Sequence, residues 1–294
     1  MNYYNEIKNR LINNEITKRI KDYSKNKSDL NTYYNVGKLL SQAGKHYGEG
    51  IIKEYSKRLT EELGKKYNET NLKRMRQFYI KIEKGATLWH QLSWSHYKLL
   101  ITLKNIDEIN YYSKLSVENL YSVRKLEIKI KSNEYERLPE KTKIKLIAKK
   151  ETNIKDLVPN PIIIKNKNNY EIISEKILQQ LILEDIPSFL DELGSGFSFI
   201  KNEYKIKLGD RYNYIDLLLF NYECNCFVVV ELKVTELKKE HIGQIEVYMN
   251  YIDNNLKKII HDKTIGIIIC KKDNKYIMQY CSDKRIFSKE YELI

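Results

Sequence analysis

The sequence predicts an α+β protein of two domains, an all-α domain followed by an α/β domain with a mixed sheet flanked by helices. Through the first 135 residues, apolar side chains recur at helical spacing. From residue 174 onward, alternating and continuous apolar runs typical of strands are interleaved with helical patterns. Between them, Pro159 and Pro161 force an extended path. We therefore expect domains at residues 1–150 and 165–294.

Length and composition limit the class of protein. The chain has 294 residues, which is enough for two cores. No apolar run approaches the ~20 residues that a membrane span needs. The first residues, MNYYNEIKNRLINNE, lack the apolar segment of a signal peptide. We expect a cytoplasmic protein with no membrane partner and with its four cysteines reduced.

The net charge of +13 is distributed unevenly. Residues 1–150 hold 32 Lys and Arg against 17 Asp and Glu, whereas the remainder holds 20 against 22. This asymmetry favours a division of labour, in which one part holds a polyanion and the other performs chemistry. The alternative is that a lysine-rich composition gives solvated helical faces and nothing more.

Two helices of the first domain have the form of a helix-turn-helix. Ile51–Leu63 is amphipathic and ends at Gly64, and Thr70 is expected to cap Asn71–Ile82. Such a unit either binds DNA, contacts another protein or serves as scaffold. If it binds nucleic acid, the contacting side chains are Lys73, Arg74, Arg76 and Gln77.

The remaining sequence of the first domain also predicts helices. Leu88–Leu100 carries Trp89 and Trp94, which we interpret as core anchors rather than base-stacking platforms. Ile106–Leu115 and Val117–Ile130 complete the helical set.

The second domain predicts the element order α-β-β-β-α-β-β. Its elements are a helix at Ser174–Leu193, a strand region at Phe197–Leu208, a hairpin at Tyr212–Val234, a helix at Leu237–Leu256, a strand at Thr264–Cys270 and a last strand at Tyr276–Tyr280.

Three charges lie inside the otherwise apolar runs of the predicted hairpin. If Phe220 pairs with Phe227, antiparallel register places Asp216 opposite Glu231. Lys233 follows Glu231 by two residues and therefore points to the same face. A slip of one residue would separate the three charges.

Buried carboxylates are costly unless they are paired or bind a metal. Two carboxylates with retained waters suit Mg²⁺, with Mn²⁺ as a substitute. A lysine beside them can orient an attacking water or stabilise a pentavalent phosphate. The alternative is a solvated strand face with a surface salt bridge, but the apolar surroundings of Asp216 and Glu231 favour the buried site.

The order Asp, about fourteen residues, then Glu-x-Lys resembles the active site of PD-(D/E)xK nucleases, whose restriction-endonuclease-like core has the same element order. The chain is more closely similar to the YhcG-like family, a helical domain of unknown function fused to such a nuclease. The resemblance rests on HYGEGIIKEYSKRL, NLKRMRQFY, LSWSHYKLL and YERL in the first half, and on FLDELGSGFSFI, YIDLLLFN, VVVELK, GQIEVYMNYID and IGIIIC in the second.

The resemblance implies roles for five residues. Asp216 and Glu231 match the metal carboxylates, and Lys233 matches the catalytic lysine. Glu184 stands where relatives often carry an acid that adds a metal ligand through water. Gln244 matches a glutamine that contacts phosphate or the metal shell and is counted with the catalytic residues.

The function implied is a Mg²⁺-dependent endonuclease that cleaves DNA, in genome defence, mobile-element or recombination contexts. RNA stays open as a substrate, as does a homodimer. One departure is Glu203, where relatives often have glutamine; an acid that points into the site would hinder DNA binding. The alternative function is a non-catalytic nucleic-acid-binding or adaptor protein that keeps the fold.

Overall fold

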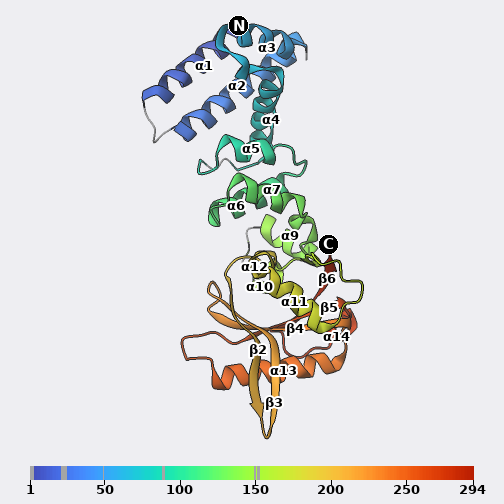
Figure 1. Ribbon diagram of the computed structural model, residues 1–294. Helices are drawn as coiled ribbons and strands as arrows, with labels where there is room; N and C mark the ends of the chain where they lie inside the picture. Colours follow the sequence, from blue (N-terminus) through green and yellow to red (C-terminus); the bar gives the residue numbers. More distant parts are fainter. Residues whose placement is uncertain (1–2, 21–24, 49, 88–89, 149, 151–152) are drawn as a thin grey trace. The chain divides into compact units, whose positions relative to one another are not determined.

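The computed structural model describes residues 3–20, 25–48, 50–87, 90–148, 150 and 153–294, with the side chains of residues 15–27 outside this description. Contacts divide the chain into two compact units, Met1–Tyr135 and Glu136–Ile294 (Figure 1). None of the helices in the described ranges is long and apolar enough to cross a membrane. Trp89 lies outside the described residues.

The described regular elements of the first unit are helices, as predicted. They are α1 (Tyr3–Ile20), α2 (Lys25–Tyr47), α3 (Ile51–Leu63), the 3₁₀ turn η1 (Lys65–Tyr67), α4 (Glu69–Glu83), α5 (Trp94–Leu100), α6 (Ile106–Glu118), α7 (Val123–Lys131) and α8 (Glu134–Arg137), which runs into the second unit.

Helix α4 begins earlier than predicted, so the assignment of Thr70 as its N-cap is wrong. The Asn68 side chain accepts a hydrogen bond from the Asn71 amide at 3.0 Å, and Asn is a stronger N-cap than Thr. The predicted helix Val117–Ile130 is also two helices, because Leu120 has a φ of 51° and Ser122 caps α7.

The second unit begins before residue 165 because the preceding segment packs onto it. The guanidinium of Arg137 pairs with Glu192 of α12, and Lys289 of β6 donates to the Val158 carbonyl. Glu192 Oε1 also accepts from the Ile163 amide at 3.0 Å. These contacts tie residues 136–164 to the sheet domain.

The second unit contains α9 (Glu140–Ile147), α10 (Ile154–Leu157), β1 (Ile162–Ile164), α11 (Glu175–Glu184), α12 (Ile186–Leu193), β2 (Phe197–Leu208), β3 (Arg211–Asn221), β4 (Cys226–Glu236), α13 (Lys239–Asn255), β5 (Ile265–Lys272), α14 (Lys275–Gln279) and β6 (Ile286–Leu293). The sheet order is β1-β6-β5-β4-β3-β2. The β2–β3 and β3–β4 pairs are antiparallel and the others parallel, which confirms a mixed sheet.

Two predicted elements of this unit are wrong in detail. The helix expected at Ser174–Leu193 is broken at Asp185, whose side chain caps α12 just before Pro187. The last strand expected at Tyr276–Tyr280 is helix α14, capped by Asn274. The final strand is β6, which lies between β5 and β1.

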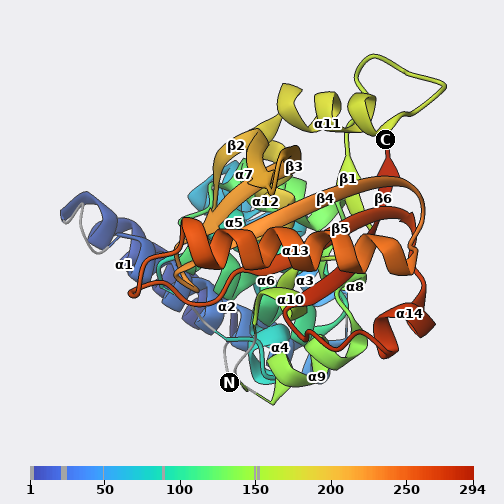
Figure 2. The same cartoon turned by 90° about the horizontal axis from the view of Figure 1, so that it is seen from below.

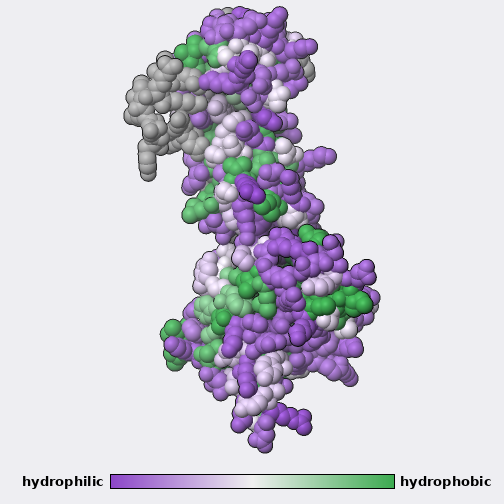
Figure 3. Space-filling view, viewed as in Figure 1, coloured by the Kyte–Doolittle hydropathy of each residue, from purple (hydrophilic) through white to green (hydrophobic). Residues whose placement is uncertain are grey.

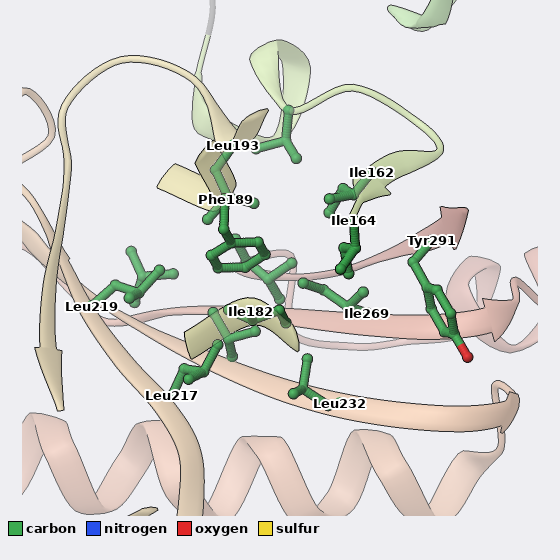
Figure 4. Close-up of a cluster of buried hydrophobic side chains, with 14 of the residues drawn as sticks. Ile162, Ile164, Ile182, Phe189, Leu193, Leu217, Leu219, Leu232, Ile269 and Tyr291 are labelled. Carbon is green, nitrogen blue, oxygen red and sulfur yellow. The ribbon is translucent and has the colours of Figure 1, made fainter. Parts of the chain in front are cut away.

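Helices cover both faces of the sheet (Figures 1 and 2). On one face α11 and α12 form the α11-side core, in which Ile182 and Phe189 lie beside Leu217, Leu219 and Ile269 (Figure 4). On the other face α13 forms a second cluster, the α13-side core, with strands β2 to β6. Apolar burial on both faces of β4 explains why its sequence reads as a continuous apolar run.

Candidate active site

The hairpin of β3 and β4 has the predicted register. Phe220 pairs with Phe227, with ring centroids 5.3 Å apart, and the pairing continues to Leu217 and Val230. Asp216 follows next on β3, and its Oδ2 accepts from the Leu232 amide at 2.8 Å. Its carboxylate therefore reaches β4 beside Glu231.

Glu231 lies at the centre of a buried polar cluster and is only 2% exposed. Its Oε1 accepts from Lys233 Nζ and from Gln244 Nε2, each at 2.8 Å. Its Oε2 is buried and has no hydrogen-bond partner among the described residues. Leaving a carboxylate oxygen unpaired in the core is costly, so this atom is suited to a ligand from outside the chain.

The two carboxylates disfavour each other's charge. Burial, reinforced by Asp216, raises the pKa of Glu231 to about 7. Burial also raises the pKa of Asp216, against the opposing effects of the Leu232 amide and Lys233. For Lys233, burial lowers the pKa but Glu231 outweighs it, so the net direction is upward. A divalent cation would stabilise both carboxylates in the charged form.

Two helices hold this cluster in place. From α13, Gln244 Nε2 donates to Glu231 and also to the Tyr248 hydroxyl at 3.1 Å. From α11, Gln179 Nε2 donates to the backbone carbonyl of Asp216 at 3.0 Å. Helix α11 thus holds β3 at Asp216, and helix α13 holds the Glu231 side chain of β4.

The acid that approaches the cluster from α11 is Glu175 rather than Glu184. Glu175 Oε2 lies 3.6 Å from Lys233 Nζ. Glu184, nine residues later and ~14 Å along the helix, accepts from Asn168 and Gln180 instead. Sequence reasoning missed Glu175; the available signal was its place directly after the N-cap Ser174.

Glu203 also belongs to the surroundings of Asp216. It lies on β2 between two residues that pair with Leu217 and Ile215, so it stands opposite Asp216. Its φ of 45° is unusual for a residue with a side chain. Its carboxylate adds to the upward shift of the Asp216 pKa, so the departure from glutamine does place an acid near the site.

The four residues of α4 that were predicted to contact nucleic acid differ in exposure. Lys73 is exposed and pairs with Glu69 at 2.6 Å, and Gln77, one turn later, is also exposed. Arg74 and Arg76 are half-buried. The Arg76 guanidinium lies along Gly44 of α2, about 3.6 Å from where a side chain there would begin.

Family models match both units of the chain. Residues 8–137 match the DUF1016 N-terminal domain, and residues 155–294 match the YhcG PDDEXK nuclease domain. The chain joins a DUF1016 N-terminal domain to a YhcG PDDEXK nuclease domain. The second unit is thus a PD-(D/E)xK nuclease domain, and Asp216, Glu231 and Lys233 lie in its central hairpin.

Relatives of this YhcG-like chain include one curated protein, "Putative nuclease YhcG" of Escherichia coli (strain K12). The two are 24% identical over 283 residues, covering 81% of this chain and 76% of that protein. Solved structures with a similar part include a repair endonuclease from Pyrococcus abyssi and the EndoMS-dsDNA2 complex. Both are 19% identical with a TM-score of 0.29, covering 43% of this chain and 48% of theirs. The chain thus spans about half the length of these structures.

Proposed function

We propose that the YhcG nuclease domain is a Mg²⁺-dependent endonuclease that cleaves phosphodiester bonds of DNA. The observation that carries this proposal is the unpaired, buried Oε2 of Glu231 beside Asp216. No group of three or more His, Cys, Asp or Glu in the described part of the chain is arranged so that it could hold a metal ion. Two carboxylates nevertheless fit Mg²⁺, which commonly takes one or two protein carboxylates and keeps several waters.

Each residue of the cluster has a distinct part in this proposal. Asp216 and Glu231 hold the cation, which when bound supplies charge neutralisation and acidifies water. Lys233 Nζ, held by Glu231 and near Glu175, donates to a phosphate oxygen and stabilises the charge that develops there. Lys233 and Gln244, the latter also bonded to the Tyr248 hydroxyl, occupy Glu231 Oε1, which would leave Oε2 for the cation.

The test is cleavage of linear, branched and single-stranded DNA, and of RNA, with Mg²⁺ or Mn²⁺. Asp216→Asn and Glu231→Gln should abolish cleavage while the thermal unfolding transition stays cooperative. The matched control is Glu292→Gln, which changes an exposed acid on β6. This variant should cleave like the wild type. Equal cutting by the two site variants and wild type would reject the assignment.

A second function is favoured by the charge of the first half. The excess of 32 basic over 17 acidic residues in 1–150 suits binding to a polyanion with or without cleavage. Salt-dependent DNA binding with no metal-dependent cleavage of any substrate would favour this non-catalytic role.

A further inference from the structure

A strip of tyrosines and lysines lies on the outer half of the β2–β3 hairpin. Lys205 pairs with Tyr214 and Lys207 pairs with Tyr212, so the four side chains share one face of the two strands. Tyr212 is 56% exposed and Tyr214 is 51% exposed. About half of the surface of each tyrosine therefore faces solvent on a regular strand.

The opposite face of this hairpin fixes it to the domain. Ile206 and Ile215, which alternate with the strip, are buried in the α13-side core. The strip thus lies on a firmly packed element and not on a loose loop. In Figure 1 the hairpin extends beyond α13, and in Figure 3 pale and purple residues cover it. Packing in the core explains why isoleucines occupy the buried face of the hairpin, but it does not explain why tyrosines occupy the exposed face.

The chemistry of the strip suits a flexible polyanion with flat groups. Lys205 Nζ lies 3.7 Å from the centroid of the Tyr212 ring, and Arg211 adds a third cation at the turn. Exposed rings beside cations are the combination that binds single-stranded nucleic acid, because every unpaired base can stack on a ring while the backbone meets positive charge. In a duplex the base faces are already stacked on one another.

The strip lies on the same strand as Asp216 of the proposed active site. Tyr214 and Tyr212 precede Asp216 by two and four residues, which corresponds to about 7 and 14 Å along an extended strand. We propose that the strip binds a single-stranded DNA segment next to the bond that is cut, with bases stacked on Tyr212 and Tyr214 and phosphates contacted by Lys205 and Lys207. Its relation to the cut rests on the proposed function, whereas the binding itself does not.

The test measures binding without metal, so that no cleavage occurs. The full chain is titrated in EDTA against a labelled oligothymidylate longer than the ~16-nucleotide upper site size of single-strand-binding folds. Tyr212→Leu and Tyr214→Leu should each weaken binding about tenfold, and the corresponding Phe variants should not. Tyr222→Leu is the matched control, because Tyr222 is 62% exposed just beyond the other end of β3.

Photocrosslinking locates the contact even if the basic helical unit also binds DNA. The same oligonucleotide carrying 5-iododeoxyuridine should crosslink to a peptide that contains Tyr212 and Tyr214. Affinity of the Leu variants within about twofold of the control, or crosslinks only outside the hairpin, would overturn the proposal. An oligouridylate that binds while oligothymidylate does not would overturn the choice of DNA.

The outcomes separate this proposal from the nuclease proposal. Weaker single-strand binding in the Leu variants, without cleavage by the wild type, would keep the strip and reject the nuclease. Metal-dependent cleavage that Asp216→Asn abolishes, with unchanged single-strand binding in the Leu variants, would do the reverse.

Discussion

At the scale of single residues, the orientation of Glu231 depends on a short hydrogen-bond chain from α13. Gln244 links the Tyr248 hydroxyl to Glu231 Oε1. Gln244→Leu removes this link and lets the carboxylate turn, so we expect the Mg²⁺ concentration for half-maximal cleavage to rise about 10- to 100-fold. Tyr248→Phe keeps the buried ring and should raise this Mg²⁺ concentration less.

Metal titrations of cleavage rate separate this role from a general loss of stability. A positioning role predicts that excess Mg²⁺ restores much of the rate of Tyr248→Phe. If Gln244→Leu leaves the Mg²⁺ dependence unchanged, the hydrogen-bond chain has no part in metal binding.

Lys289 makes the free energy of unfolding depend on pH. Burial lowers its pKa to about 8 from 10.5; Lys155 adds to the shift and Asp156 and Asp273 oppose it. Between these values the unfolded chain still holds the proton that the folded chain has released, so stability rises with pH. Relative to Lys289→Met, the wild type should gain about 2 kcal/mol from pH 7 to pH 9.5 in urea unfolding.

Equal pH dependence in the two proteins would contradict this interpretation of Lys289. Tyrosines and cysteines also titrate in this range, but they are common to both proteins and cancel in the difference. The ammonium donates to the Lys155 and Val158 carbonyls, which explains why a charge is kept at this buried position.

Some residues of the site could be predicted from the sequence and others could not. The two-residue period of strands and the pairing of Phe220 with Phe227 together place Asp216, Glu231 and Lys233 near one another, so this part of the site could be predicted from the sequence. Glu175 could not, because its approach to Lys233 depends on how α11 crosses the sheet. Glu184 has the same chemistry on the same helix but lies at the wrong end.

At the scale of elements, helix packing in the first unit depends on one glycine of α2. A Cβ at Gly37 would lie 2.1 Å from the Met75 carbonyl oxygen of α4, which is backbone and cannot move alone. Gly37→Ala should therefore destabilise the protein by about 1–3 kcal/mol. Gly44→Ala, in the same helix with its nearest atoms at 3.6 Å, should be neutral or stabilising through helix propensity.

Chemical denaturation of the two variants checks the close approach of α2 and α4. Similar stabilities for Gly37→Ala and Gly44→Ala would show that the helices have room to separate. The pair is informative because both changes add the same methyl group to the same helix, and only its surroundings differ.

Elements that one strong local pattern defines were predictable, and those that depend on competition between patterns were not. The β3–β4 hairpin has a strongly apolar run on each side of a polar turn, and its register followed. The segment Tyr276–Tyr280 is less apolar and, with its Asn274 cap, forms a helix, while β6 takes the place in the sheet between β5 and β1.

At the scale of the whole molecule, the charge division predicts that the helical half dominates DNA affinity. Lys73 and Lys131 are both exposed lysines paired with a glutamate four residues earlier, at 2.6 and 2.7 Å. If α4 contacts phosphate, Lys73→Gln should reduce the slope of log affinity against log salt by about 0.9, whereas Lys131→Gln should leave it unchanged.

The comparison decides between a nucleic-acid surface and a merely solvated one. A solvated basic face predicts equal, small effects for the two lysines, because only the net charge changes by one in each variant. A contact surface on α4 predicts in addition that Gln77→Lys, one exposed turn beyond Lys73, steepens the salt dependence. Duplex binding measured between 50 and 200 mM salt gives these slopes directly, since phosphate contacts by cations release a countable number of condensed ions.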